Sequence, residues 1–290
     1  MNATATRRAL LGLTSTLLAA CATEQQGGAA TLEGGPLLRI EPAAPAAGGR
    51  FAQGGLALGR VPAGSKVTLD GKPVRVGPDG RFALGFGRDA EADARLGVTA
   101  PNGRTEVRAL SVLKREWDVQ RISGLPQSMV SPNAQQMARI QRERTRIAAI
   151  RRIDSDLPHF SEGFVWPAQG RISGVFGSQR ILNGEARAPH LGLDIAAPTG
   201  APVRAMGAGQ VLLAEDLYFT GNTVLVDHGR GVVSLYAHLS RMDVREGEVL
   251  QQGQALGAIG ATGRATGPHL HLGLHWLSTA LDPQPLLPPL

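Results

Sequence analysis

The sequence lacks the features that would cross-link the protein or carry it through a membrane. Its 290 residues contain a single cysteine, Cys21, so no disulfide can form within the chain. No apolar run reaches the ~20 residues that a spanning helix needs. The formal net charge is +6, but no long block of Lys or Arg concentrates it. A mildly basic, solvated surface explains this charge better than an anionic polymer does, and we expect no nucleic-acid partner.

The N-terminus resembles a bacterial lipoprotein signal. Arg7 and Arg8 precede a short apolar run that closes with Leu-Ala-Ala-Cys, so we expect a signal peptide over residues 1–20. Cleavage would leave Cys21 to receive a lipid anchor; the alternative is an unpaired thiol in an exported protein. Ala22 is not the Asp that retains lipoproteins in the inner membrane, which predicts a periplasmic, outer-membrane location. Export by the general or the twin-arginine route stays open.

The next two segments differ sharply in pattern. Residues 21–49 are rich in Gly, Ala and Pro, which predicts a flexible tether. Over residues 50–115, short alternating runs are separated by Asp-Gly, Pro-Asp-Gly and Asn-Gly turns. These runs predict a small β-sandwich-like domain, and it contains no cluster of His, Asp or Glu with ligand spacing.

A linker over residues 116–156 is predicted to contain one helix. Ser131 and Pro132 suit a helix start, and apolar residues then recur at helical spacing, which predicts a helix over residues 132–152. Short strands with Gly-rich turns return over residues 157–290 and predict an antiparallel β domain. The expected fold class is therefore mainly β.

All seven histidines lie in the C-terminal half of the chain, which points to one site. His190 and Asp194 offer two donor types that zinc accepts. In an extended strand their α-carbons would lie ~13 Å apart, so Gly192 must allow a bend. His269 and His271 alternate in a predicted strand and should therefore share a face.

These residues belong to a series of motifs that resembles the M23 peptidases, the LytM or lysostaphin-like endopeptidases of the cell wall. The resemblance covers about residues 166–283. In order along the chain, the matching segments are Gly174-Val175-Phe176-Gly177, His190 to Asp194 continuing to Gly200, Gly221-Asn222, Asp227-His228-Gly229, Tyr236-Ala237-His238-Leu239, Thr262-Gly263 and Gly267 to His271. The resemblance implies a LytM-type peptidase domain over residues 157–290.

The resemblance also implies a catalytic zinc site. The Zn²⁺ ligands fall on His190, Asp194 and His271, and three protein ligands leave one tetrahedral position open for water. His238 and His269 match the two histidines that handle this water; one takes its proton and the other stabilises the oxyanion, in an order that the sequence leaves open. The implied substrate is peptidoglycan, and the expected bond is the D-alanyl-diaminopimelate cross-link.

Several residues depart from the pattern or lie outside it. Leu272-Gly273 stands where many family members have Phe-Glu, so a possible carboxylate beside the site is absent. Loss of such a partner would weaken the site by ~10 to 100-fold without abolishing it. His275 is expected at the rim or surface, with a spare ligand as the alternative. His228 is expected to be structural or exposed. Tyr218 and Tyr236 are candidates to assist the oxyanion, although packing in a strand explains Tyr236 equally well.

Two other classes of function compete with the enzyme. A non-catalytic LytM-type activator of cell-wall amidases would share the fold, but such regulators typically have lost ligands that this chain retains. A purely structural wall-binding lipoprotein would leave the five aligned residues unexplained. The first domain and the helix are also candidates to cover the groove of the peptidase domain.

Overall fold

The computed structural model describes residues 35–46, 49–123 and 131–290. The predicted signal peptide, Cys21 and the first part of the predicted tether lie outside these residues. The chain divides into the units Met1–Gly35 and Pro36–Leu290, and all the assigned helices and strands belong to the second. In the described part of the chain, no helix has both the length and the apolar character to cross a membrane.

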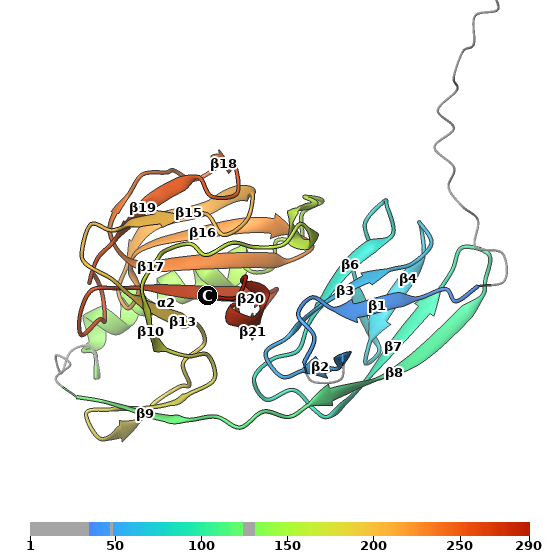
Figure 1. The fold of residues 1–290 in the computed structure, drawn as a ribbon, viewed down its shortest axis with the longest axis horizontal. Coiled ribbons are helices and arrows are strands. Elements are labelled where there is room, and N and C mark those ends of the chain that lie inside the picture. Colours follow the sequence, from blue (N-terminus) through green and yellow to red (C-terminus); the bar gives the residue numbers. More distant parts are fainter. Residues whose placement is uncertain (1–34, 47–48, 124–130) are drawn as a thin grey trace, which may run out of the picture. The chain divides into compact units, whose positions relative to one another are not determined.

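The first module of this unit is a β-sandwich (Figure 1). Its strands are β1 (Arg39–Pro42), β2 (Phe51–Ala52), β3 (Leu56–Arg60), β4 (Lys66–Leu69), β5 (Lys72–Val74), β6 (Arg81–Gly85), β7 (Asp93–Thr99) and β8 (Thr105–Leu113). One sheet has the order β1-β3-β6 and the other β2-β8-β7-β4-β5. Phe82 and Leu84 of the first sheet share one buried cluster with Leu96 and Val112 of the second. The small β-sandwich-like domain predicted from the sequence is therefore confirmed.

Strand β1 lies inside the segment predicted as a tether. It pairs antiparallel with β3, and Leu37 and Leu38 just before it are buried in the sandwich core. A tether extending to residue 49 is thus wrong for this strand. The many Gly, Ala and Pro residues of this segment made it resemble a flexible tether. Its apolar residues Leu37, Leu38 and Ile40 nevertheless pack on the sandwich core and stabilise the strand there.

Strands β3 and β6 of the sheet β1-β3-β6 are apolar on both faces. In β6, Phe82 and Leu84 face the sandwich core, whereas Ala83 between them joins the core of the following module. Leu56 of β3 joins the same second core, together with Leu281 near the C-terminus. Because successive side chains of a strand point to opposite faces, this one sheet serves two cores.

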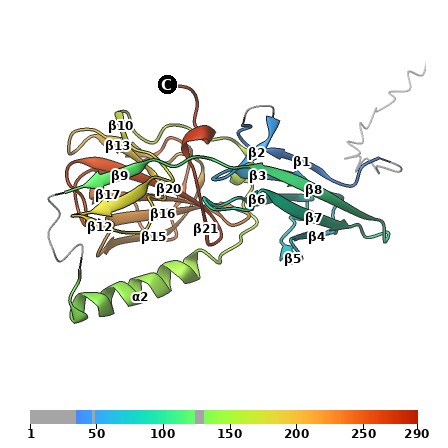
Figure 2. The same ribbon diagram turned by 90° about the horizontal axis from the view of Figure 1, so that it is seen from below.

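The linker helix α2 (Ala134–Ile150) lies within the predicted range of 132–152. Its N-cap is Asn133 and not Ser131: Asn133 accepts a hydrogen bond from the backbone of Gln136, whose side chain accepts one from the backbone of Asn133. Ile150 packs with Leu213 and other apolar residues on one face of the large sheet of the second module, along which the helix lies (Figure 2).

The second module is a β domain, as predicted. Its strands are β9 (Val119–Ile122), β10 (Arg171–Gly174), β11 (Gln179–Leu182), β12 (Glu185–Ala186), β13 (Leu193–Ala196), β14 (Pro202–Arg204), β15 (Gly209–Leu217), β16 (Gly221–Gly229), β17 (Val232–Met242), β18 (Val249–Leu250), β19 (Ala255–Ile259), β20 (His269–Trp276) and β21 (Thr279–Leu281), with short 3-10 turns η2 (His159–Ser161) and η3 (Gln284–Leu286). The main sheet has the order β10-β13-β20-β17-β16-β15-β18, visible in Figure 1, and a small sheet has the order β12-β11-β9.

The core of this module fixes two neighbouring strands of the main sheet. Leu193 and Ile195 of β13 and Leu270 and Leu272 of β20 are fully buried. Polar residues alternate with these anchors along both strands, so the two strands turn their polar side chains toward the opposite face. The candidate site lies on that face.

Candidate metal centre and active site

Three potential metal ligands meet beside β13 and β20. Nε2 of His190 lies 3.0 Å from Nδ1 of His271 and 3.0 Å from Oδ1 of Asp194, and Nδ1 of His271 lies 2.8 Å from the same oxygen. In the part of the chain that the structure describes, these three residues are the one such group of His, Cys, Asp or Glu. The structure thus brings together the three predicted zinc ligands.

Strand register places two of the ligands. Asp194 of β13 is directly opposite His271 of β20 in an antiparallel ladder, and Ala196 is opposite His269. Directly opposed residues have their side chains on the same face and within reach of one another. The predicted common face of His269 and His271 follows from the same alternation, because the intervening Leu270 is buried in the core.

The third ligand, His190, lies in the loop before β13 and is held by the Gly-Val-Phe-Gly motif. Its backbone N–H donates to the carbonyl of Ser178 at 2.8 Å, and its carbonyl accepts from Gly177 at 2.7 Å. Its ring Nδ1 donates to the carbonyl of Val175 at 3.0 Å. The chain bends at Gly192, so His190 and Asp194 do not lie along one extended strand.

Close packing requires glycine at two positions around the ligands. A Cβ on Gly192 would lie 2.5 Å from Cε1 of His271 and 2.6 Å from the carbonyl oxygen of Leu272. A Cβ on Gly174 would lie 2.5 Å from Oδ2 of Asp194. Both glycines therefore leave room for the ligand side chains themselves.

The charge state of the three ligands fits a metal ion. Burial lowers the pKa of His190 to about 4, and its Nδ1–H is committed to Val175, so the neutral ring presents the lone pair of Nε2. Burial alone would raise the pKa of Asp194, but His190 and His271 outweigh it and hold that pKa well below its ordinary value. Ligand atoms in a tetrahedral zinc site lie ~3.3 Å apart, close to the separations found here. Lone pairs this close repel one another unless a proton or a metal ion lies between them.

His238 reaches the site through a β-bulge. Tyr236 of β17 pairs with Val224 of β16, and Leu239 pairs with Asn222. Two residues of β17 therefore lie opposite one residue of β16. His238 has a φ of 61°, in the left-handed region, while Tyr236 and Leu239 on either side both remain in the core. The bulge thus directs His238 out of the core and into the site, as bulges beside active sites commonly do.

His238 and His269 form a pair of oriented imidazoles next to the ligands. Their ring centroids are 4.7 Å apart, and Nε2 of His269 lies 3.8 Å from Oδ1 of Asp194. Nδ1 of His238 donates to the carbonyl of Thr262 at 2.7 Å, and Nδ1 of His269 donates to that of Gly267 at 2.8 Å. Burial, reinforced by the neighbouring histidines, lowers the pKa of His238 to about 3. In a neutral ring with Nδ1 protonated, Nε2 is free to accept a proton.

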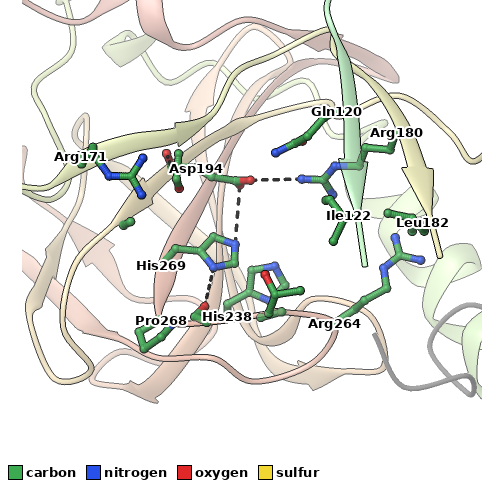
Figure 3. Close-up of a pocket in the computed structure, with 15 residues that line it drawn as sticks. Gln120, Ile122, Arg171, Arg180, Leu182, Asp194, His238, Arg264, Pro268 and His269 are labelled. Atoms are coloured by element: carbon green, nitrogen blue, oxygen red, sulfur yellow. Dashed lines mark hydrogen bonds and ion pairs between the residues drawn. The ribbon is translucent and has the colours of Figure 1, made fainter. Parts of the chain in front are cut away.

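A pocket of about 270 Å³ opens beside these side chains (Figure 3). Asp194, His238 and His269 line it, and so does Gln120 of β9, from the segment that precedes α2. Arg180 of β11 also lines it and donates from Nη2 to Oδ2 of Asp194 at 3.1 Å. Sequence reasoning missed Gln120 and Arg180 because neither belongs to a motif. Only the parallel pairing of β9 with β11 brings them to the site.

Trp117 anchors the segment that leads into β9 to the Gly-Val-Phe-Gly motif. Its ring lies edge to face with Phe176 at a centroid distance of 5.8 Å. The guanidinium carbons of Arg115 and Arg88 lie 4.6 and 5.3 Å from its centroid, in cation–π contact. A Cβ on Gly177 would lie 1.9 Å from the indole, so the ring packs directly on the motif that holds His190.

The remaining candidates serve the core. The prediction that His275 lies at the rim is wrong: it is 4% exposed and lies in the interior of the module, on the part of β20 that pairs with β17 and β21. His228 is structural, with Nδ1 donating to a backbone carbonyl at 2.7 Å and Nε2 2.8 Å from the hydroxyl of Ser234. Tyr236 is fully buried and its hydroxyl accepts from the backbone of Met206, so it packs and does not face the pocket.

Known proteins resemble the part of the chain that carries this site. The model of peptidase family M23 matches residues 188–283. The chain is 42% identical over 105 residues to peptidoglycan DD-endopeptidase ShyA of Vibrio cholerae, which is 36% of this chain and 24% of ShyA. It is 44% identical over 101 residues to DD-carboxypeptidase/endopeptidase Mpg of Neisseria meningitidis, which is 35% of this chain and 23% of Mpg. The chain therefore spans about a quarter of the length of these curated relatives.

A solved structure extends the likeness beyond the site. A Pseudomonas aeruginosa protein described as a peptidase M23 aligns with a TM-score of 0.65 and 31% identity, over 82% of this chain and 95% of that one. This share is much larger than the segment that the family model matches. The alignment covers nearly the whole of that relative, and the fold brings together the five His and Asp residues of the family motifs. The chain therefore belongs to peptidase family M23.

Proposed function

We propose that this protein is a zinc-dependent endopeptidase that hydrolyses the peptide cross-links of peptidoglycan, at the D-alanyl-diaminopimelate bond. The observation that carries the proposal is the convergence of His190, Asp194 and His271 beside two oriented imidazoles in an accessible pocket. The choice of substrate is supported by the relatives, since ShyA is named a peptidoglycan DD-endopeptidase.

The donor set supports zinc as the metal. Two imidazole nitrogens and one carboxylate oxygen are typical of catalytic zinc sites, in which the protein supplies three ligands. When bound, zinc would lower the pKa of a water and polarise the scissile carbonyl. The protein's own contribution is to hold the ligands: Val175 fixes the ring of His190, and Arg180 fixes Asp194.

His238 and His269 supply the proton transfers. Their backbone acceptors, Thr262 and Gly267, fix the Nδ1–H tautomer and leave Nε2 of each neutral ring as a proton acceptor. One of the two takes the proton of the attacking water and gives it to the leaving amine, and the other ring is assigned to the side of the oxyanion. The pKa of His238, lowered to about 3, keeps this ring neutral before reaction.

One experiment distinguishes this endopeptidase from a non-catalytic activator of cell-wall amidases. Purified diaminopimelate-type peptidoglycan is digested with the protein in the presence of zinc or of a chelator, and the fragments are resolved by mass. We expect chelator-sensitive conversion of cross-linked dimers to monomers, lost in a His271→Ala variant. If the wild-type protein with zinc leaves the dimers intact, the endopeptidase is refuted and the regulator becomes the better description.

We also propose that the protein acts in the periplasm, attached by a lipid on Cys21 to the outer membrane. The proposal is supported by the signal-like N-terminus and by a substrate found in the cell envelope. Mass spectrometry of the mature protein tests it. We expect a chain that begins at a lipid-modified Cys21, and an unmodified Cys21 or a retained Met1 would refute the anchor.

A further inference from the structure

The pocket beside the metal ligands has a strong excess of positive charge. Three arginines line it, Arg171, Arg180 and Arg264. Asp194 is the one acidic side chain among the described residues of the lining, and it already faces the metal site. In Figure 3, Arg180 and Arg264 lie on one side of Asp194 and His269, and Arg171 lies on the other. A divalent ion on the ligands would add to this excess, so the pocket is suited to an anionic group.

Arg264 is positioned for such a group by its neighbours. Its backbone N–H donates to the carbonyl of Phe219 at 2.8 Å, and its guanidinium lies over the ring of Phe219, 4.5 Å from the centroid. Burial, followed by repulsion from Arg180 and Arg187, lowers its pKa, although a guanidinium stays charged at neutral pH. An anion bound there would relieve this repulsion between like charges.

Arg180 offers a second donor group on the same side. Its Nη2 is committed to Oδ2 of Asp194 at 3.1 Å, but its Nε is buried and has no hydrogen-bond partner among the residues that the structure describes. A buried donor without an acceptor is costly, so a small shift of the side chain that brings Nε to an oxygen of the bound anion would be favourable. Since Arg180 also holds a metal ligand, it links the bound anion to the geometry of the metal site.

The chemistry of the cross-link provides an anion in the right place. The amine that leaves in D-alanyl-diaminopimelate hydrolysis is attached to a carbon that also carries a carboxylate. That carboxylate is separated from the scissile carbonyl carbon only by the nitrogen and this one carbon. A glycine bridge, or a diaminopimelate whose carboxylate is amidated, has no charge at this position.

We propose that Arg264, assisted by Arg180, binds the free carboxylate on the leaving side of the scissile bond and makes the enzyme selective for unamidated diaminopimelate. The inference rests on the proposed endopeptidase activity and names the part of the substrate that this side of the pocket recognises. Arginine suits the task because its planar donors match the two oxygens of a carboxylate.

Two purified cross-linked muropeptide dimers test the proposal, one with a free and one with an amidated carboxylate on the acceptor diaminopimelate. We expect wild-type kcat/KM to be about 10- to 100-fold higher for the free form, the effect of one charge-assisted interaction. Arg264→Gln should lower kcat/KM for the free form alone and bring the ratio close to one. Arg264→Lys should retain part of the preference. Arg241→Gln, on the exposed surface, is the matched control and should keep the wild-type ratio.

The outcomes separate the inference from the proposed function. Equal wild-type rates on the two dimers, or an unchanged ratio in Arg264→Gln with bound zinc retained, would overturn carboxylate recognition and leave the endopeptidase standing. If the wild-type protein cleaves neither dimer, the proposed function itself fails. The wild-type comparison needs no variant, so it tests the selectivity even if Arg264→Gln does not fold, and Arg264→Lys then tests the role of Arg264.

Discussion

A single methyl group at Gly192 should damage the metal centre. In Gly192→Ala, the new Cβ would lie 2.5 Å from Cε1 and 2.7 Å from Nε2 of His271, and 2.6 Å from the backbone oxygen of Leu272. Carbon atoms normally approach to ~3.5 Å, so the imidazole must retreat by ~1 Å. Metal–ligand distances tolerate only ~0.2 Å. His271 would therefore lose its position as a ligand.

We expect the affinity of Gly192→Ala for zinc to fall by at least ~10 to 100-fold. Overpacking should also reduce the free energy of unfolding of the metal-free protein by ~1–3 kcal/mol. Zinc affinity is measured by competition with a chromophoric chelator, and stability by urea unfolding. Gly267→Ala is the matched control, because no atom of the described residues lies within 4 Å of its Cβ position, and it should bind zinc like the wild type. If Gly192→Ala also binds zinc as tightly as the wild type, the close approach of Gly192 and His271 is not a feature of the working protein.

Three further predictions concern residues away from the ligands. Trp117→Ala should release β9 from the pocket wall and lower kcat/KM by ~10 to 100-fold; unchanged activity would show that β9 is not needed. Burial lowers the pKa of His228 to about 4. Below pH ~6.5 the unfolded chain therefore binds a proton at this residue that the folded chain does not bind. This difference should lower the unfolding free energy by ~2 kcal/mol between pH 7 and pH 5. Denaturant unfolding of the metal-free His228→Gln variant should show a correspondingly smaller loss, and an equal loss would contradict the assignment. Tyr236→Phe should lower the unfolding free energy by ~1–3 kcal/mol, because the buried N–H of Met206 would lose its acceptor. The kcat should stay unchanged, and a large fall in kcat would instead show that Tyr236 takes part in the reaction.

Local patterns in the sequence predicted the parts of the site that depend on local geometry. Alternation with buried leucines placed His269 and His271 on one face of a strand, and β20 has this form. The bend required between His190 and Asp194 is present at Gly192. The small sandwich and the linker helix were also predictable, since turn residues and helical spacing act over short distances in the chain.

Long-range packing produced the features that the sequence did not reveal. Gln120 and Arg180 reach the pocket through pairing of β9 with β11, and no motif marks either residue. His238 depends on a bulge that simple alternation does not predict. His275 was misplaced because alternation along β20 does not show that this end of the strand is buried. For Gln120 and Arg180 the missing information lies in a neighbouring strand distant in sequence, whereas His238 and His275 depend on how strands adjacent in sequence pair and pack.

In the proposed mechanism, three residues bind the metal and two others transfer protons. Zinc content and cleavage of cross-linked dimers, measured on the same samples of His190→Ala, His238→Ala and His269→Ala, test it most directly. We expect His190→Ala to lose both zinc and activity, and the other two variants to keep zinc close to the wild-type level while losing activity. Retained activity in His238→Ala or His269→Ala, or retained tight zinc binding in His190→Ala, would contradict the account.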